Sequence, residues 1–406
     1  MKKRIRTCLH YLRRIFIYIC KGFISLIPKD NDLIMFSAWF GRKYADNSMY
    51  MYEYLLENSE YKVFWYTREK SIYKELKTEN KPAVYAKSLM GIWKQIRAIM
   101  LVSSVQLADF NPYFLKNCIY LDLGHGFIIK ASGFDQPDVS KRSMSFDLLL
   151  RKGINYYMAV TSTTTMQLTS RAFKVPYSNM VFCNSARLDA LFDESLKKGK
   201  NEKVSEIAKG RRIISYLPTH RSCGKVKIPV AELMDLQTID SICEKTNSVF
   251  MIKKHFYHRN EKESINQYKN IFDITGEDIE TQTLLAQTDV LITDYSACYI
   301  DFLLLDRPII FFAYDLEDYL HKERDLYFPF EDNHAGFKPR NKYELNGAIE
   351  QISAKWIDLD HELGRLDLKK RYFDEDSPVG HAREHMKSVM GQLISGTYMS
   401  KWKEDK

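Results

Sequence analysis

Short apolar runs alternate with helix-length segments along most of this chain of 406 residues. The clearest unit is 289–315, where one apolar run ends in Thr293 and Asp294, a polar corner follows, and a helix-length segment leads into a second apolar run. Short apolar runs separated by a helical pattern are typical of parallel strands buried on both faces. Further runs predict strands over 33–38, 61–66, 101–107, 118–123, 154–161, 212–217 and 249–252. This rhythm predicts an α/β fold with doubly wound parallel sheets in two Rossmann-like domains.

The first 27 residues follow a different pattern, in which apolar residues recur at alternating spacings of four and three. These residues are Ile5, Leu9, Leu12, Phe16, Ile19, Phe23 and Leu26. On a helix they form one stripe, with Lys3, Arg14 and Lys21 opposite it. Basic residues interrupt every run that could span a membrane, so we predict a basic amphipathic helix that lies on an anionic membrane surface. A helix that docks on the protein's own core or on a partner is the alternative.

The distribution of charge argues against a nucleic acid as a partner. The chain has 60 Lys and Arg residues against 52 Asp and Glu residues, a net charge of +8. Residues 1–29 contain eight of the basic residues and no acidic one, so they carry the whole excess and the remainder is neutral. The seven cysteines lack CxxC spacing, which favours a reducing cytosol and argues against structural zinc. We interpret the acidic clusters at 358–360 and 374–376 as solvated faces, and we expect no metal and no cofactor.

Length and composition allow two domains, each with its own core. Between 189 and 212 the sequence becomes rich in Lys and Glu, and its apolar residues recur with only weak periodicity. Such a stretch is typical of a crossing between two domains. We therefore divide the chain into an amphipathic helix at 1–27, a first Rossmann-like domain at 28–190, and a second Rossmann-like domain with a helical tail at 191–406.

Polar corners follow the predicted strands of the first half. Gly124, His125 and Gly126 come directly after the strand 118–123. Glycines let the backbone turn sharply, and an imidazole can accept a proton at neutral pH, so His125 is a candidate general base. The alternative is an ordinary turn with an exposed histidine. Likewise, 46–48 (Asp-Asn-Ser) is either a set of ligand contacts or an N-cap cluster, of which the cap is favoured.

The second half has three corners of this kind. Arg221 follows 212–217 and could place its guanidinium on a phosphate. Lys253 and His255 follow 249–252, and Asp294 with Ser296 follows the next strand. The helix after Ser296 could bind an anion at its N-terminus, unless Ser296 only caps it. Since ligands of open α/β sheets bind at the carboxyl ends of strands, the corners suit transfer from a diphosphate donor to a hydroxyl; neither a P-loop nor GxGxxG is present.

Four motifs together resemble the CDP-glycerol glycerophosphotransferase family of teichoic acid and capsule synthesis. They are GHG with Lys130 at 124–130, PTHR at 218–221, KKH at 253–255 and TDYSACYIDFLLLDRPIIFFAYDLEDY at 293–319. The stretch WFGRKYADNSMYMYEYL at 39–55 is also similar to that family's N-terminal domain. The sequence departs from the family's usual hydroxyl residues at Phe127 and Ala297, and Ala297 can offer only its backbone.

The resemblance implies a GT-B-like pair of Rossmann-type domains, held peripherally at the cytoplasmic face of a bacterial membrane, with CDP-glycerol as donor. His125 would deprotonate an acceptor hydroxyl of a lipid-linked or polymeric glycan, which would attack the glycerol-linked phosphorus and release CMP. Arg221, His255 and the helix end at Ser296 would hold the diphosphate. The resulting candidates are His125 and His255 for catalysis, and Gly124, Gly126, Lys130, Thr219, Arg221, Lys253, Thr293, Asp294, Ser296 and Ala297 for substrate binding.

Several alternatives stay open at the level of sequence. CDP-ribitol is the nearest variant of the donor, and a GT-B nucleotide-sugar glycosyltransferase could use the same architecture. A membrane-associated binding module without turnover is the non-enzymatic alternative. The sequence does not decide which glycan is the acceptor, whether one unit or many are added, or whether the protein is a homo-oligomer.

Overall fold

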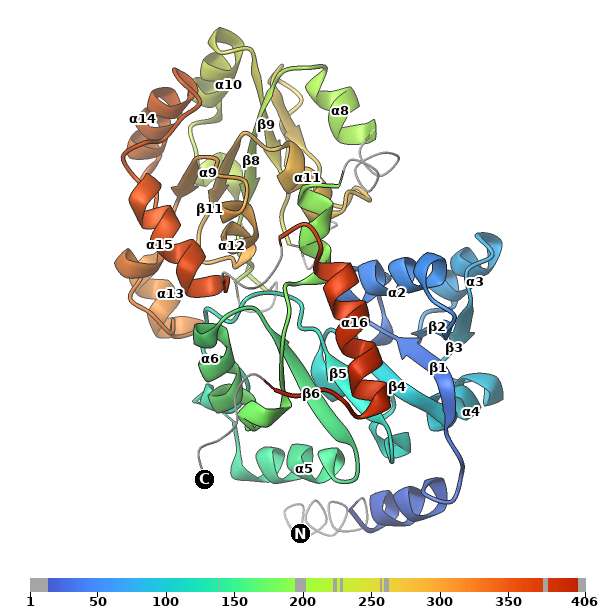
Figure 1. Cartoon of the computed structure of the whole chain (residues 1–406). Helices are drawn as coiled ribbons and strands as arrows, with labels where there is room; N and C mark the ends of the chain where they lie inside the picture. Colours follow the sequence, from blue (N-terminus) through green and yellow to red (C-terminus); the bar gives the residue numbers. More distant parts are fainter. Residues whose placement is uncertain are drawn as a thin grey trace, which may run out of the picture. The chain divides into compact units, whose positions relative to one another are not determined.

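The computed structural model describes residues 14–137, 139–193, 202–221, 225–226, 229–255, 258, 263–374 and 379–400. The chain divides into two compact units (Figure 1). Unit 1 consists of Met1–His125, Gly133–Arg187 and Asp376–Lys406, and unit 2 consists of Gly126–Ser132 and Leu188–Glu375. This differs from the predicted division, because the C-terminal tail is assigned to unit 1 and the short segment 126–132 to unit 2. A single boundary in the sequence cannot describe units that are each built from separate segments of the chain.

Unit 1 is built on a seven-stranded sheet in which all neighbouring strands are parallel. Its order is β3-β2-β1-β4-β5-β6-β7, so the direction of winding reverses between β1 and β4. The strands are β1 (Asp30–Phe36), β2 (Lys62–Thr67), β3 (Ala83–Tyr85), β4 (Ala98–Ser103), β5 (Ile119–Asp122), β6 (Asn155–Val160) and β7 (Met180–Phe182). The helices are α2 (Asp46–Asn58), α3 (Lys70–Thr78), α4 (Leu89–Arg97), α5 (Lys141–Arg151), α6 (Thr163–Phe173) and α16 (Ala382–Ser395).

Unit 2 has a five-stranded parallel sheet of order β10-β9-β8-β11-β12, with its reversal between β8 and β11. The strands are β8 (Arg212–Leu217), β9 (Ser248–Ile252), β10 (Ile271–Asp273), β11 (Val290–Thr293) and β12 (Ile309–Phe311). The helices are α8 (Glu202–Ala208), α9 (Val230–Leu233), α10 (Leu236–Lys245), α11 (Thr281–Gln287), α12 (Cys298–Leu303), α13 (Leu316–Lys322), α14 (Lys342–Ser353) and α15 (Glu362–Tyr372). The prediction of parallel sheets is confirmed in both units.

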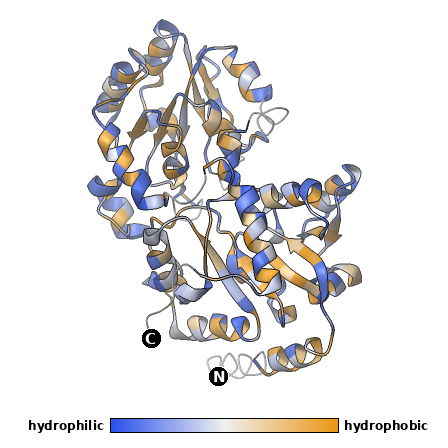
Figure 2. Ribbon diagram, in the orientation of Figure 1, coloured by the Kyte–Doolittle hydropathy of each residue, from blue (hydrophilic) through white to orange (hydrophobic). Residues whose placement is uncertain are grey.

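The unit 2 sheet is buried on both faces, as its sequence pattern predicts. Along β8, Ile213 and Leu217 pack in one apolar cluster, while Ile214 and Tyr216 pack in another. Alternate residues of a strand point to opposite faces, so each face carries its own core. Figure 2 shows orange, hydrophobic residues along the strands of both units.

The segment 289–315 forms a strand, a helix and a strand, as predicted. These elements are β11, α12 and β12. The helix, however, has only six residues, and its N-cap is Ala297 without a side-chain hydrogen bond. Ser296 lies one position earlier and accepts from the Cys298 amide at a long 3.5 Å. Ser296 is therefore not the N-cap, and the short helix offers a weaker dipole than the pattern indicated.

Residues 14–24 are helical and present two unlike faces. The stripe residues Phe16, Ile19, Phe23 and Leu26 are 56%, 52%, 69% and 80% exposed. On the other face Ile17 and Ile24 are buried, and Lys21 Nζ donates to the carbonyls of Leu150 (2.6 Å) and Lys152 (2.8 Å). Burial lowers the Lys21 pKa to about 8, so this lysine does not belong to a solvated polar face as predicted. Ile5, Leu9, Leu12 and Lys3 lie outside the described residues.

No helix in the described part of the chain is long and apolar enough to cross a membrane.

Candidate active site

His125 lies at the carboxyl end of β5 in unit 1, and its surroundings define its tautomer. Its Nδ1 is 3.0 Å from the carbonyl oxygen of Ser104, which follows β4. A carbonyl can only accept, so Nδ1 carries a proton, and in the neutral imidazole Nε2 then presents a lone pair. The ring is exposed. This is the tautomer that a general base needs, at the strand end where the sequence placed it.

The two glycines beside His125 have different roles. Gly124 has φ 66°, in the left-handed region, and its amide donates to Asp122 Oδ1 at 2.9 Å. Gly126 does not have a positive φ, and a Cβ built there would meet nothing within 4 Å. The turn therefore requires glycine at position 124, and the space around position 126 does not.

Asn47 supports this loop, and neither Asp46 nor Asn47 caps α2. The N-cap is Ala45, and it makes no side-chain hydrogen bond, so the favoured prediction of a cap cluster is wrong. Instead, Asn47 Nδ2 donates to the carbonyls of Leu123 (3.2 Å) and Gly124 (3.0 Å). The buried Asp46 carboxylate pairs with Arg187 at 3.2 Å. Asn47 thus holds the backbone that leads to His125, and Asp46 ties the start of α2 to Arg187.

Asp109 is a buried residue of the unit 1 edge that the sequence did not single out. One oxygen of its carboxylate accepts from the amides of Ser104 (2.8 Å) and Val105 (2.9 Å), and the other from Phe40 (2.6 Å). Burial raises the Asp109 pKa even against these three donors. The carboxylate thus joins the corner after β1 to the corner after β4. Asp109 ends a short 3-10 helix, Gln106–Asp109, and no periodic pattern in the sequence marks this position.

In unit 2, Arg221 and Asp294 form the corner between the switch-point strands β8 and β11. Arg221 pairs with Asp315 through Nε (2.8 Å) and Nη2 (2.9 Å), and Nη2 also contacts Asp294 at 3.0 Å. Burial alone would lower the Arg221 pKa, but Asp294 and Asp315 raise it above its usual value. Arg221 Nη1 donates to Thr219 O at 2.7 Å. The guanidinium that was expected to bind a phosphate is engaged with these carboxylates.

Thr219 and Thr293 differ in what their hydroxyls do. Thr219 donates its amide to Asp294 Oδ1 at 2.8 Å, whereas its buried Oγ1 has no hydrogen-bond partner among the described residues. Thr293 Oγ1 donates to the carbonyl of Leu217 at 2.7 Å and is fully buried. The Thr293 hydroxyl thus ties β11 to β8, whereas the Thr219 hydroxyl makes no such tie within the part of the chain that the structure describes.

Lys130 belongs to the unit 2 edge although it precedes that unit in sequence. Its segment pairs with 325–327, since Ala131 N donates to Asp325 O (2.9 Å) and Tyr327 N donates to Ile129 O (3.0 Å). Burial lowers the Lys130 pKa to about 8, with Asp294 opposing this effect. The pairing explains why a residue from the predicted first domain lies beside the second domain's corner.

His255 lies beside a second histidine, His220, which was in the PTHR motif but was not proposed as a site residue. Their ring centroids are 4.6 Å apart. Burial lowers the His220 pKa to about 4, and Lys130 adds to the effect. Lys253 turns away, since its Nζ donates to the Ile279 carbonyl at 2.7 Å. The edge therefore gathers Lys130, Thr219, His220, His255, Asp294 and Ser296, without the Lys253 ammonium.

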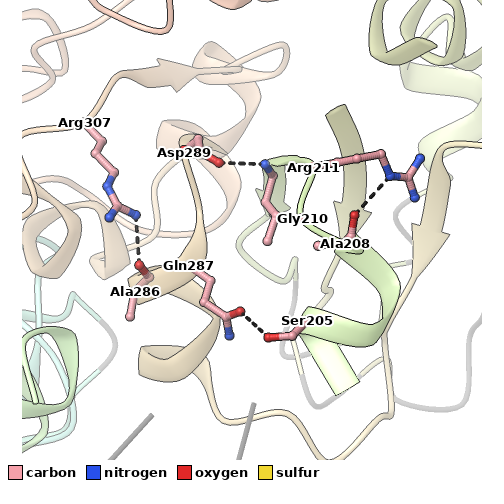
Figure 3. A pocket seen from close by; sticks show the side chains of 9 residues that line it. Ser205, Ala208, Gly210, Arg211, Ala286, Gln287, Asp289 and Arg307 are labelled. Atoms are coloured by element: carbon pink, nitrogen blue, oxygen red, sulfur yellow. Dashed lines mark hydrogen bonds between the residues drawn. The ribbon is translucent and has the colours of Figure 1, made fainter. Parts of the chain in front are cut away.

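A cavity of about 350 Å³ lies elsewhere in unit 2 (Figure 3). Arg211 and Asp289, which precede β8 and β11, line it, so it opens at the amino ends of the strands. Its arginines are bonded to backbone, for example Arg307 Nη1 to Ala286 O at 2.9 Å. The cavity does not coincide with the predicted site. Within the described ranges, no three His, Cys, Asp or Glu side chains are grouped to hold a metal.

Comparison with known proteins agrees with this architecture. The fold is similar to that of the wall teichoic acid polymerase TagF, with a TM-score of 0.74 at 18% identity, over 97% of this chain and 98% of that one. The class is thus a two-unit α/β protein with parallel sheets. The family model for CDP-glycerol:poly(glycerophosphate) glycerophosphotransferase matches residues 20–377. The chain belongs to this family.

Two curated relatives show the range of the family. A teichoic acid poly(glycerol phosphate) polymerase of Bacillus spizizenii is 26% identical over 76% of this chain and 80% of its own length. The teichoic acid ribitol-phosphate polymerase TarL of Staphylococcus aureus is 33% identical over 42% of this chain. The match covers only 31% of TarL, so that relative is much longer than the shared region.

Proposed function

We propose that this protein transfers glycerol phosphate from CDP-glycerol to a hydroxyl of a membrane-associated glycan, lipid-linked or polymeric, and releases CMP. The family model supports this reaction. The names of the two relatives, from Bacillus spizizenii and Staphylococcus aureus, support a role in teichoic acid synthesis. One observation carries the proposal. The hydrogen bond from His125 Nδ1 to Ser104 O leaves Nε2 able to accept a proton at the edge of the unit 1 sheet.

In the proposed reaction, His125 Nε2 takes the proton of the acceptor hydroxyl while the hydroxyl oxygen attacks the phosphorus that bears glycerol. The bond from this phosphorus to the oxygen that it shares with CMP breaks, and CMP leaves with the bonding electrons. The acceptor gains one glycerol phosphate. Catalysis of phosphoryl transfer depends mainly on positioning and on positive charge around the transferred group.

Unit 2 would bind the donor. Lys130 supplies an amino group whose charged form Asp294 favours, and Thr219 supplies a buried hydroxyl. His255 and the residues around Ser296 would contact the diphosphate. Arg221 acts as a positioning residue in this scheme, because its bonds to Asp294 and Asp315 hold the corner.

CDP-ribitol is the second candidate donor, and the similarity to TarL favours it as such. CDP-glycerol takes precedence because the family model names it, and a structure of TagF is of a variant soaked with CDPG. Competition between the two donors for one purified sample would distinguish them.

The site of action would be the cytoplasmic face of a bacterial membrane, to which the protein is bound peripherally. The exposed apolar residues Phe16, Ile19, Phe23 and Leu26 support this, because such a face beside basic residues is suited to an anionic lipid surface. The double variant Phe16→Ser, Phe23→Ser should sediment less with anionic vesicles than the wild type. Leu359→Ser, an equally exposed change in unit 2, is the control, and unreduced sedimentation of the double variant would exclude this helix as the anchor.

The reaction is tested by CMP release from CDP-glycerol or CDP-ribitol, with a lipid-linked disaccharide or a short oligo(glycerol phosphate) as acceptor. We expect His125→Ala to lower kcat by about 10²–10⁴-fold, the usual contribution of a general base. Donor binding by calorimetry should be retained, and Tyr343→Ala, at an exposed residue of α14, should keep the wild-type rate. Donors left intact by the wild type with every acceptor, or a full rate for His125→Ala, would contradict the proposal.

A further inference from the structure

We propose that the turn after β1, which carries Trp39 and Lys43, is a subsite for the acceptor and takes an anionic polyol phosphate chain. Trp39 would lie against the terminal polyol, and Lys43 would contact the phosphodiester behind it. This inference rests on the proposed function, because it names the ligand of the unit 1 edge. The geometry of the edge, the strain of the turn and its chemistry each support it.

The subsite lies where an open α/β sheet binds ligands. Trp39 follows β1, Ser104 follows β4 and His125 follows β5, and these three strands are neighbours in the sheet. The order of the sheet reverses between β1 and β4. Crevices at the carboxyl ends of strands beside such a reversal are the usual ligand sites of this architecture.

The turn is held in a conformation that aromatic residues rarely adopt. Trp39 and Phe40 have φ of 50° and 63°, both in the left-handed region. The Phe40 amide donates to Asp109 Oδ1 (2.6 Å), and Trp39 Nε1 donates to Asp46 Oδ2 (3.2 Å). Strain of this kind persists where surrounding bonds impose it, and it is concentrated at ligand sites. Asp109 thus fixes the backbone of the turn, and Asp46 fixes the orientation of the indole.

The chemistry of the turn matches an anionic polyol. The Trp39 ring centroid is 5.1 Å from that of His125, close enough for one ligand to touch both. Lys43 Nζ lies over the Trp39 ring, 4.9 Å from its centroid, so a ligand that lies against the indole also meets the ammonium group. An indole face is an apolar surface for the C–H groups of a polyol, and an ammonium group suits a phosphodiester. A polyol lying on Trp39 would present its terminal hydroxyl to His125.

Steady-state kinetics provide the first test, with a short oligo(glycerol phosphate) as acceptor. We expect Trp39→Ala to raise the acceptor KM about tenfold while the donor KM stays unchanged, and Trp39→Phe to restore most of the loss. Lys43→Gln should raise the acceptor KM by a similar factor and reduce its dependence on salt. An unchanged acceptor KM in Trp39→Ala and Lys43→Gln, or an equal rise in both KM values, would overturn the inference.

Tryptophan fluorescence provides a second test that needs no turnover. The oligo(glycerol phosphate) should change the emission of the wild type and of Trp93→Phe, which removes an exposed indole of α4, but not that of Trp39→Phe. No change in the wild type, or the same change in Trp39→Phe, would overturn the subsite. Failure of the proposed function would be distinct, since it would appear as an absence of CMP release by the wild type whatever the fluorescence shows.

Discussion

At the carboxyl edge of the unit 1 sheet, the buried carboxylate of Asp109 accepts hydrogen bonds from backbone amides. At the corresponding edge of unit 2, the carboxylate of Asp294 accepts from backbone amides and from a buried arginine. Asp109 accepts three N–H groups. Asp294 accepts the Thr219 and Tyr295 amides (2.8 and 2.6 Å) and Arg221. Both carboxylates lie at a switch point, but among the described residues an arginine pairs with Asp294 and none is seen to pair with Asp109.

This difference corresponds to what each edge presents outward. Unit 1 exposes an imidazole and an aromatic turn above carboxylates whose pKa values burial raises. Unit 2 brings a lysine and two histidines beside Arg221, which pairs with both Asp294 and Asp315. In the proposed reaction, the first edge would move a proton and the second would bind an anion. Substitutions of the buried carboxylates should therefore affect the two units differently.

The largest effect is expected for Asp294→Ala. It leaves the Arg221 guanidinium buried with Asp315 alone, and breaking a buried ion pair on one side costs about 3–5 kcal/mol. Hydrogen exchange of the β8 and β11 amides would report the loss within unit 2. Asp318→Ala is the matched control, because its pair with Lys322 is 68% exposed on both sides and should change stability by less than about 0.5 kcal/mol. If Asp294→Ala and Asp318→Ala destabilised unit 2 equally, the buried ion pair of Asp294 would not distinguish the unit 2 edge from the unit 1 edge.

A smaller change in stability is expected for Asp122→Asn in unit 1, and this variant should be more stable than the wild type at pH 7. Burial raises the Asp122 pKa from 3.8 to about 6. The folded state therefore holds this proton more tightly than the unfolded state, and the stability it contributes is complete below pH 3.8 and is lost as pH rises through about 6. Asparagine carries no charge, so the variant should be more stable at pH 7, by on the order of 1–3 kcal/mol.

Urea unfolding followed between pH 3 and 8 would check this prediction. The difference between wild type and Asp122→Asn should grow between pH 4 and 6 and then level off. Asp32→Asn, at an exposed carboxylate of β1, should show no such growth. A variant that is less stable than the wild type at pH 7 would show that the hydrogen bonds of Asp122 to Gly124 and Tyr156 outweigh its desolvation.

The sequence allowed the sheets to be predicted because central strands are continuous apolar runs. It also placed His125, Arg221 and Asp294 at strand ends, where the structure has them. Of the four edge strands, all of three residues, only β12 was predicted, because its apolar run continues past the strand itself, whereas β3, β7 and β10 lack such a run. The strand predicted over 101–107 is β4, Ala98–Ser103, which begins directly after Arg97 at the end of α4. Apolar residues 98–102 do not mark where the helix ends and the strand begins.

What could not be predicted depends on contacts between distant residues. Nothing local indicates that Arg221 would be satisfied by Asp315, which lies 94 positions away. The same holds for Lys130, whose segment forms backbone hydrogen bonds with 325–327. It also holds for Asp109, which accepts from the amide of Phe40, 69 positions away. Strand ends can be located from periodicity, but the hydrogen-bond partners of a side chain at a strand end depend on tertiary structure.

The smallest effects concern the two glycines beside His125. Gly124→Ala places a Cβ on a residue with φ 66° and should cost about 1 kcal/mol, with a loss of kcat because the backbone of the catalytic loop must shift. Gly126→Ala enters open space at an ordinary φ and should change stability by less than about 0.5 kcal/mol. Thermal unfolding and CMP release of both variants would check the prediction. If Gly126→Ala also abolished CMP release while remaining stable, the space beside it would have to be filled by substrate, and position 126 would belong to the binding surface as the sequence first indicated.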